Sequence, residues 1–308
     1  MRLSVVTTLY RSKPFLEAFL KEMTAAIQVL EIEDYELIFV NDGSPDDSLQ
    51  YLLTRKNDYP QLKLIDLSRN FGHHYAIQAG LAHAQGEYVF LIDNDLETSP
   101  HVLVDYYREI QEDSSLDVVY GYQETRKGNF IEKNAGSLFW VMINKLSDTK
   151  IPHNILTERL MTKQYVTELL RLQDANLFIG GLFYWVGFKQ KGVEVKKGMR
   201  EGASTYSIKR RAELMLQAIT SFSGKPLEWL FYFGLLISFF SFLFIIYLGI
   251  QKIIHQDEVQ LGWTSIVAIN VLILGIISTF LGIIGIYIYK IFRQVQGRPN
   301  AIIKKIYE

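Results

Sequence analysis

Two long stretches of the chain carry apolar side chains without a single charge, and they run from Trp229 to Ile250 and from Trp263 to Tyr289. Each is long enough for a transmembrane helix, which needs about 20 apolar residues. A helix in a soluble core normally keeps a polar face, and neither stretch shows one. The short polar loop Gln251 to Gly262 makes the pair a predicted helical hairpin in a membrane. The alternative is a large hydrophobic core.

The chain before the hairpin alternates apolar runs of strand type with runs of helical spacing. Leu3–Leu9 is β-branched and apolar, and Pro14–Leu30 places apolar residues at helical intervals. The same alternation predicts strands at Leu37–Val40, Leu62–Leu67, Tyr88–Ile92 and Asp117–Tyr120, and a helix around Tyr75–Ala84. A further helix is predicted to start at Ser44-Pro45-Asp46-Asp47, which offers an N-cap hydroxyl, a proline and first-turn acids. Repeated βα units predict an α/β fold with a mostly parallel sheet and ligands at the carboxyl ends of its strands.

Two amphipathic segments, Phe130–Leu146 and Ile208–Phe222, fit two descriptions equally well. Each could be a helix packed on the core or a helix lying at the membrane surface. The predicted layout is a domain over residues 1–207, an amphipathic juxtamembrane helix over 208–228, membrane helices over 229–250 and 263–289, and a basic tail over 290–308.

The composition hides this division. Over 308 residues, 32 Lys and Arg nearly balance 33 Asp and Glu, the net charge is -1, and the mean hydropathy of +0.08 averages a polar part with the hairpin. The absence of cysteine excludes disulfides, thiolate metal sites and a cysteine nucleophile. Without a basic excess, nucleic acid is not an expected partner.

Positive charge gathers on both sides of the hairpin. The basic residues are Lys189, Lys191, Lys196, Lys197, Arg200, Lys209, Arg210, Arg211 and Lys225 before it, and Lys290, Arg293, Arg298, Lys304 and Lys305 after it. Because short cytoplasmic segments are enriched in Lys and Arg, both flanks are predicted to be cytoplasmic. We therefore expect a multi-pass membrane protein with its large domain and both termini in the cytoplasm.

Acidic residues follow one predicted strand. In the run Phe90 to Glu97, the apolar strand ends in Asp93 and Asp95, and Glu97 lies two residues further on. Carboxylates suit Mg²⁺ or Mn²⁺, which in proteins usually bind one or two carboxylates together with substrate phosphates. The pattern predicts a metal and diphosphate site, although an Asp-x-Asp pair also occurs in ordinary surface turns.

Two further strand ends carry polar residues. In Val40-Asn41-Asp42-Gly43-Ser44, Gly43 allows a tight turn, and Asp42 could accept hydrogen bonds from a base or ribose; a plain strand-to-helix turn explains the run as well. After Leu67 come Arg69 and the pair His73 and His74. The histidines have no partner at metal-ligand spacing, so we interpret them as the first residues of a helix.

Taken in order, these runs resemble one family. The segments VNDGS, LSRNFG, AGLAHAQGEYVFLIDNDLE and GLFYWVGF, the segment Gly202 to Tyr206, the two apolar stretches and the final Gly297-Arg298-Pro299 are similar to the family-two glycosyltransferases of the polyprenyl-phosphate type, which include bactoprenol glucosyltransferases and dolichyl-phosphate mannose synthases. The resemblance covers nearly the whole chain.

The resemblance implies a GT-A fold, a nucleotide-sugar donor, a Mg²⁺ or Mn²⁺ ion, and a polyprenyl phosphate acceptor in the bacterial inner (plasma) membrane. It assigns catalysis to Asp93 and Asp95 and the metal to Asp95 and Glu97. The implied donor-binding residues are Tyr10, Asp42, Arg69 and Asp93, and the implied acceptor-phosphate residues are Arg126, Arg159, Arg200 and Ser204.

The sequence departs from the family pattern in several places. Leu9-Tyr10-Arg11-Ser12 lacks an acid that many relatives carry on the donor side, Gln123 replaces a frequent arginine, and Asn154 and Glu158 replace an aspartate and a phenylalanine. Arg200 is one residue nearer its glycine than in relatives. These departures leave the sugar, the nucleotide and the acceptor contacts open.

The function expected on these grounds is inverting transfer of a sugar to undecaprenyl phosphate, for modification of a cell-envelope glycan or O-antigen. One alternative is direct transfer to a glycan or lipid-linked oligosaccharide, including processive synthesis. Another is an inactive, transferase-like scaffold. Whether the hairpin helps to translocate the lipid-linked sugar, and whether the chain forms a homo-oligomer, are both open.

Overall fold

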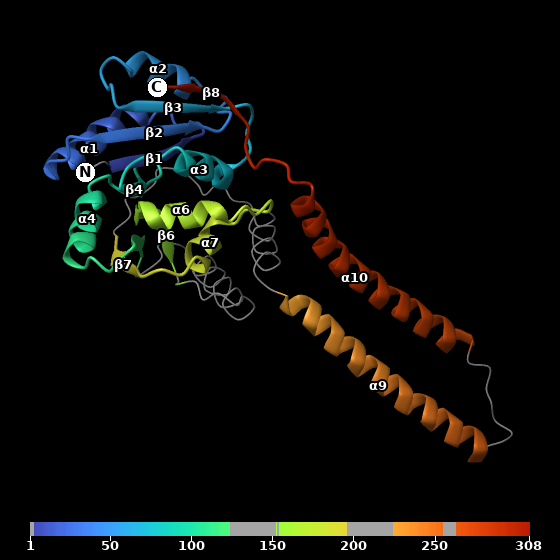
Figure 1. The fold of residues 1–308 in the computed structure, drawn as a ribbon. Coiled ribbons are helices and arrows are strands. Elements are labelled where there is room, and N and C mark those ends of the chain that lie inside the picture. Colours follow the sequence, from blue (N-terminus) through green and yellow to red (C-terminus); the bar gives the residue numbers. More distant parts are fainter. Residues whose placement is uncertain (1–2, 124–151, 153, 196–223, 255–262) are drawn as a thin grey trace.

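The α/β class predicted from the sequence is confirmed by a computed structural model, which describes residues 3–123, 152, 154–195, 224–254 and 263–308. In the described part, eight strands form one sheet in the order β7-β5-β6-β4-β1-β2-β3-β8 (Figure 1). The strands are β1 Leu3–Leu9, β2 Tyr35–Asn41, β3 Leu62–Leu67, β4 Tyr88–Leu91, β5 Val118–Tyr122, β6 Ile155–Thr162, β7 Gln190–Glu194 and β8 Ile303–Tyr307.

The centre of the sheet is parallel. Strands β3, β2, β1 and β4 are neighbours that run in one direction, whereas β6 pairs antiparallel with β4. Because β1 lies between β2 and β4, the chain builds outward on one side of β1 and then crosses to the other. Such a topological switch point is where open α/β sheets bind ligands, at the carboxyl ends of the strands. The sheet therefore directs attention to the residues that follow β1 and β4.

Helices cover both faces of the sheet. On one face lie α1 (Leu16–Val29), α2 (Ser48–Arg55) and α4 (Val102–Glu112), and on the other lie α3 (His73–Ala82), α6 (Lys163–Arg171) and α7 (Ile179–Trp185). Successive strand residues alternate between the faces, so that Val5 belongs to the first core and Val6 to the second. Helix α3 packs very close to β1, since a Cβ added at Gly80 would lie 2.5 Å from a methyl carbon of Val6.

The helix predicted after β2 is present, but its predicted start is wrong: Ser44 was expected as the N-cap, and the N-cap is Asp47. Helix α2 starts at Ser48, because the Asp46 carboxylate is used in a turn instead. Its Oδ1 accepts hydrogen bonds from the hydroxyls of Ser44 and Ser48, each at 2.6 Å, and its Oδ2 accepts one from the backbone N–H of Lys13 at 3.2 Å. The segment 44–48 therefore supports the loop that follows β1.

The end of the chain returns to the sheet. Strand β8 pairs antiparallel with β3, and Lys63 on β3 forms an ion pair with Glu308 at 2.8 Å. Residues 290–308 were expected to be a basic tail, and they contribute the edge strand of the sheet beyond β3. The polypeptide thus leaves the domain before α9 and rejoins it after α10.

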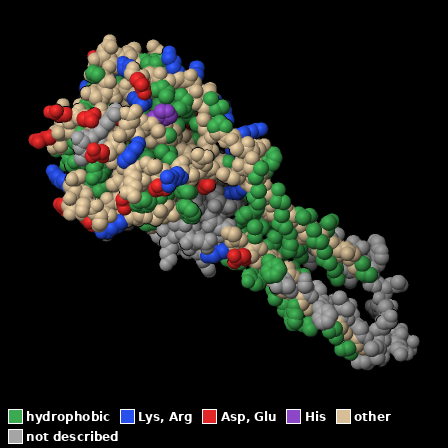
Figure 2. Space-filling view, viewed as in Figure 1, with side chains coloured by type: hydrophobic (Ala, Val, Ile, Leu, Met, Phe, Trp, Pro, Cys, Tyr) green, Lys and Arg blue, Asp and Glu red, His purple; other side chains and the backbone are tan. Residues whose placement is uncertain are grey.

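Two long helices extend away from the α/β domain, α9 (Lys225–Ile254) and α10 (Trp263–Val295) (Figure 1). Apolar side chains lie on their outer surface in the space-filling view (Figure 2), and Phe231 and Leu281 are more than 60% exposed. The alternative of a large buried core is therefore wrong for the described residues of these helices.

Within the described residues, one stretch, Ile273–Val295, has the length and apolar composition to span a membrane, with a mean hydropathy of 1.8. The two amphipathic segments predicted from the sequence, Phe130–Leu146 and Ile208–Phe222, lie outside the described residues. Residues 225–228, which were predicted to end the juxtamembrane helix over 208–228, belong to the first turn of α9.

Candidate active site

The polar residues predicted at strand ends are brought to one edge of the sheet. Tyr10 follows β1, Asp42 follows β2, Arg69 follows β3, and the run Asp93 to Glu97 follows β4. These four strands are parallel neighbours, so their carboxyl ends share that edge. Of the remaining predicted site residues, Arg159 lies on β6, while Arg126, Arg200 and Ser204 fall outside the described residues.

Asp42 fastens the loop that starts α3. Its two carboxylate oxygens accept hydrogen bonds from the backbone N–H groups of Phe71, at 2.7 Å, and Gly72, at 3.0 Å. The side-chain amide of Asn70 donates to the Asp42 carbonyl oxygen at 3.0 Å. Asp42 is buried, and a carboxylate that accepts such charge-assisted bonds is held firmly. Part of the hydrogen-bonding capacity that the sequence offered to a base or ribose is thus used within the protein.

Gly43 allows the loop after β2 to approach the loop after β3 closely. Its φ of +58° lies in the left-handed region, and a Cβ at this position would be 2.5 Å from the backbone nitrogen of Asn70. Any larger residue would separate the loop after β2 from the loop after β3. The tight turn predicted at Gly43 is confirmed, and it serves to join two strand ends.

The Asp93–Glu97 run forms a compact turn anchored to β1. The side-chain amide of Asn94, which is buried, donates to the backbone oxygen of Thr8 at 2.8 Å. Leu96 has a φ of +59°, and the backbone N–H of Glu97 donates to Asp95 Oδ1 at 3.1 Å. Asn94 therefore points into the protein between the two aspartates. The turn holds Asp93 and Asp95 at the β1/β4 switch point.

His73 is a site residue that was not assigned to the site from the sequence. It is the first residue of α3, as predicted, and its ring bridges two strand ends. Its Nδ1 lies 3.1 Å from Thr8 Oγ1, and its Nε2 lies 3.6 Å from Asp93 Oδ1. The only signal in the sequence was its place at the start of a helix directly after β3, and that place did not reveal the neighbouring acid.

The environment of the His73 imidazole favours its neutral form. Desolvation lowers its pKa below the ordinary value, because the surrounding protein disfavours the imidazolium, and the carboxylates of Asp42 and Asp95 partly oppose this effect. A neutral ring can donate from one nitrogen and accept at the other. His73 therefore links Thr8 to Asp93 without adding a fixed positive charge to the edge.

Tyr10 and Arg69 lie at the margins of this edge. Tyr10 is 51% exposed, and the Arg11 guanidinium lies 5.7 Å from its ring centroid. Arg69 donates to the Asn70 carbonyl oxygen at 2.9 Å and stacks over the ring of Phe71 at 4.0 Å. Both side chains are accessible, so each can meet a ligand that enters at the strand ends.

Arg159 lies in the interior of the domain. It is 1% exposed, and its guanidinium carbon lies 3.4 Å from the ring centroid of Phe183 on α7. Its Nε and Nη2 donate to the backbone oxygens of Thr157 and Leu156, each at 3.1 Å. Its Nη1 has no hydrogen-bond partner among the described residues. The sequence predicted an arginine that contacts a phosphate, and it gave no sign of this burial.

Burial also governs the ionisation of the groups around Arg159. It lowers the pKa of the guanidinium, while Tyr165 and Tyr184 act in the opposite direction. Burial raises the pKa of Tyr165 to about 12, so its hydroxyl stays protonated and donates to the Phe183 carbonyl oxygen at 2.7 Å. Arg159 thus lies among protonated tyrosines and the ring of Phe183, with the carboxyl of the buried Glu158 also acting on its charge.

The strand-end carboxylates fit a divalent cation of the Mg²⁺ or Mn²⁺ class. Among the described residues there is no group of three or more His, Asp or Glu side chains placed to hold a metal. Such ions commonly use only one or two protein carboxylates and complete their shell with water and substrate phosphates. Asp93, whose side chain is 35% exposed, and the half-buried Asp95 meet that requirement. Glu97 lies two residues beyond, on the same turn.

Comparisons with known proteins identify the family of the chain. Residues 4–170, which include strands β1 to β6, match the sequence profile of the family described as Glycosyl transferase family 2. The chain is 39% identical to a protein of Mycobacterium tuberculosis described as "Putative glycosyltransferases", over 100% of this chain and 89% of that one. It is 31% identical to the SfII prophage-derived bactoprenol glucosyl transferase of Shigella flexneri, over 99% of this chain and 98% of that one.

A solved structure resembles the domain more distantly. The S. aureus TarS fragment 1-349 in complex with UDP-GlcNAc aligns with 72% of this chain and 66% of its own, at 20% identity and a TM-score of 0.47.

Proposed function

The chain belongs to glycosyltransferase family 2, and from that premise we propose that it transfers a sugar from a nucleotide-sugar donor to a polyprenyl phosphate at the cytoplasmic face of a membrane. Its α/β domain is GT-A-like. The observation that carries the proposal is the turn after β4, which holds Asp93 and Asp95 at the β1/β4 switch point. Full-length similarity to bactoprenol glucosyl transferases supports the choice of acceptor.

The donor binds at the acid-lined edge in this proposal. Asp93, Asp95 and Glu97 would hold Mg²⁺ or Mn²⁺, which neutralises the charge that develops on the departing nucleoside diphosphate. Asn94 and His73 keep the two aspartates in place, through the contacts to Thr8 and Asp93. Tyr10 and Arg69 are the accessible side chains beside the edge, so they are the proposed contacts of the nucleotide.

The acceptor needs positioning more than activation. A phosphate monoester has a second pKa near 6, so at neutral pH it is already mostly a dianion and needs no strong general base. The protein must hold it in line with the sugar and offset its charge. Arg126, Arg159, Arg200 and Ser204 are the proposed phosphate contacts. Of these four residues the structure describes Arg159, and its Nη1 is a hydrogen-bond donor that has no partner among the described residues. A single in-line displacement inverts the configuration at the sugar carbon.

Both long helices cross the membrane in this proposal. The stretch Ile273–Val295 spans about 35 Å at 1.5 Å per residue, against about 30 Å of bilayer hydrocarbon. Since β8 rejoins the sheet after α10, the chain ends on the side of the membrane where the domain lies. If α10 crosses, then α9 must cross as well. The basic flanks favour the cytoplasm as that side.

The decisive test offers the full-length protein in membranes a panel of nucleotide sugars together with undecaprenyl phosphate. We expect one sugar to yield a new glycolipid, identified by its mass, and the product to disappear when divalent metal is chelated. Asp95→Asn should lower the rate at least about a hundredfold, because it weakens the charge that holds the metal. Asp58→Asn, which alters an exposed acid that pairs with Arg55, is the matched control and should leave the rate unchanged.

Three results would contradict the proposal. Wild-type turnover in a folded Asp95→Asn variant would show that the strand-end acids do not take part in the transfer reaction. Transfer of sugar to a glycan, with no glycolipid intermediate, would favour direct transfer instead. Failure to bind any nucleotide, or to hydrolyse any nucleotide sugar, would favour an inactive scaffold.

A further inference from the structure

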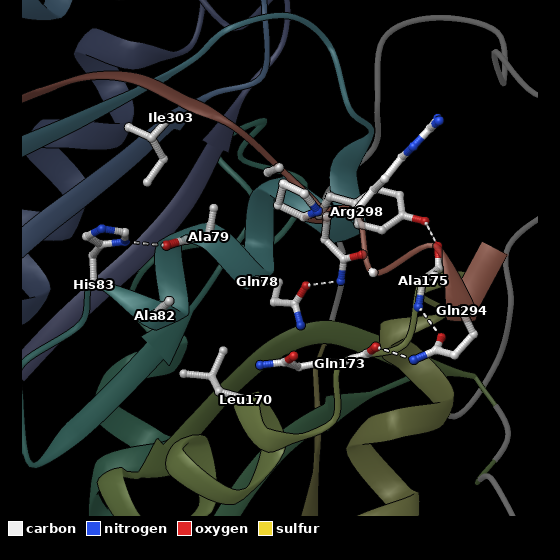
Figure 3. A pocket seen from close by; sticks show the side chains of 15 residues that line it. Gln78, Ala79, Ala82, His83, Leu170, Gln173, Ala175, Gln294, Arg298 and Ile303 are labelled. Atoms are coloured by element: carbon white, nitrogen blue, oxygen red, sulfur yellow. Dashed lines mark hydrogen bonds between the residues drawn. The ribbon is translucent and has the colours of Figure 1, made fainter.

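A cavity lies beside α3, next to the core on that face of the sheet, and none of the strand-end acids lines it. It has a volume of about 640 Å³ and is formed by α3, the segment 170–175 at and after the end of α6, and the segment 294–303 from the end of α10 to the start of β8 (Figure 3). It shares no residue with the candidate active site. Its lining includes small and apolar side chains from all three parts, namely Ala79, Ala82, Leu170, Ala301 and Ile303.

Hydrogen bonds fix the walls of this cavity. The side-chain amide of Gln294 accepts from the backbone N–H of Ala175 at 2.8 Å and donates to the Gln173 carbonyl oxygen at 2.9 Å. The amide of Asn300 donates to Gln78 on α3 at 2.8 Å and to the Asp174 carbonyl oxygen at 3.2 Å. The close-up shows the bonds that Gln294 makes with Gln173 and Ala175 (Figure 3). The cavity is therefore a built feature of the fold.

The position and charge of the cavity indicate what enters it. Gln294, one of its lining residues, is in the last turn of the candidate span Ile273–Val295, which is the depth of lipid headgroups if α10 crosses a bilayer. Arg298 lies on the rim, and its side chain extends into open space (Figure 3). No hydrogen bond or ion pair ties its guanidinium to the part of the chain that the structure describes. Basic pockets beside membrane helices on the cytoplasmic side suit anionic headgroups.

We propose that this cavity binds the headgroup of an anionic phospholipid, with Arg298 contacting the phosphate at its rim. The inference rests on the membrane placement of α10, which is part of the proposed function. A guanidinium is well suited to a phosphate, because it can donate two parallel hydrogen bonds. A bound lipid would join α10, the tail and α3, and α3 begins at His73 beside Asp93.

The test uses the full-length protein purified in a neutral detergent and titrated with phosphatidylglycerol or phosphatidylcholine. Bound lipid is counted by native mass spectrometry, and the thermal unfolding midpoint is followed in parallel. We expect wild-type protein to retain phosphatidylglycerol in preference to phosphatidylcholine and to unfold at a higher temperature with it, as a ligand of the native state requires.

Two variants address the cavity and one serves as control. Arg298→Gln should weaken phosphatidylglycerol binding about tenfold, because a charge-assisted contact is lost. Ala82→Leu fills the cavity from α3 with a residue that favours helix, and it should weaken binding similarly. Lys305→Gln removes an equal charge from β8, outside the lining, and should change binding less than about twofold.

The outcomes separate this site from general attraction and from the substrate site. Equal losses in Arg298→Gln and Lys305→Gln would reduce the effect to surface charge and overturn the proposal. Preferential retention of undecaprenyl phosphate, displacing phosphatidylglycerol, would assign the cavity to the acceptor and also overturn it. Binding of phosphatidylglycerol that depends on Arg298, in a protein that makes no glycolipid with any donor, would leave this proposal standing and overturn the proposed function alone.

Discussion

The acidic turn after strand β4 and the neighbouring strand β6 hold their charged side chains in opposite ways. After β4, Asp93 is 35% exposed and Asp95 is half-buried, so both carboxylates keep a water-accessible side. Beside β4, on β6, Arg159 is buried against Phe183 and contacts backbone carbonyl oxygens. The acids can receive a ligand without rearrangement, whereas the arginine is already part of the packing. The first region is built for exchange and the second for fixed position.

The free-energy cost of removing a charged group from water is offset by different contacts in the two regions. Burial of an ion requires that its lost hydration be replaced by hydrogen bonds or an opposite charge. Arg159 receives carbonyl oxygens and an aromatic face, and one of its nitrogens stays without a partner in the described residues. Asp42, at the acid-lined edge but buried like Arg159, receives two backbone N–H groups. Substitutions at these positions should therefore affect stability and activity in different proportions.

The largest effect on stability is expected at Arg159. Arg159→Ala should lower the free energy of unfolding by about 3 kcal/mol or more, because it leaves a cavity beside Phe183 and removes two hydrogen bonds to backbone carbonyls. Arg159→Met keeps much of the volume and should restore most of that stability. Denaturant unfolding of the purified protein measures both.

The same pair tests whether Arg159 also binds the acceptor. If it does, a folded Arg159→Met variant should show a higher KM for undecaprenyl phosphate and an unchanged KM for the donor. Normal acceptor kinetics in that variant would show that Arg159 only supports packing. The acids after β4 would then bind ligand, and the arginine on β6 would serve stability alone.

An intermediate effect is expected at Asp42. In Asp42→Asn one oxygen becomes an NH₂ donor that faces a backbone donor, so the variant should lose about 2 kcal/mol of stability. The start of α3 would loosen, and we expect the KM for the donor to rise. Denaturant unfolding and donor kinetics check the two effects. Asp47→Asn, at a carboxyl that is 76% exposed and pairs with Lys13, should stay within about 0.5 kcal/mol. Equal losses in both variants would show that the Asp42 contacts to the 71–72 backbone do not matter.

Much of the sheet was predictable because its strands are short apolar runs between turn residues. The predicted limits of Leu3–Leu9 and Leu62–Leu67 agree with β1 and β3. The start of α2 was not predictable in the same way. Ser44 and Asp46 carry the composition of a helix cap, but they form hydrogen bonds with a loop more than 30 residues earlier in the chain. A local pattern cannot report a partner that distant.

The candidate site divides along the same line. The strand-end acids were predictable, since their position depends on the strand that precedes them. The contact of His73 with Asp93, the burial of Arg159 and the pairing of β8 with β3 all join residues far apart in sequence. For β8, the segment Ile303–Tyr307 has two lysines and no long apolar run, and its strand form depends on the exposed edge of β3. Such features follow from tertiary packing and not from any local run.

The smallest predicted effect is a pH dependence of stability that arises from His74, at the start of α3. The Nδ1–H of His74 donates to the Leu177 carbonyl oxygen at 3.2 Å, and burial lowers the pKa of the ring; that hydrogen bond opposes the shift and His73 adds to it. Above about pH 6.5, the ordinary pKa of histidine, the ring is neutral in both states and does not weaken the fold. As the pH falls below that value, the unfolded chain binds a proton more readily than the folded one, so stability decreases. We expect His74→Gln to lose less stability than wild type between pH 7.5 and 5.5, by below about 1 kcal/mol, in urea unfolding. Carboxylates titrate mostly below this window, and parallel losses in the two proteins would place the pH dependence elsewhere in the chain.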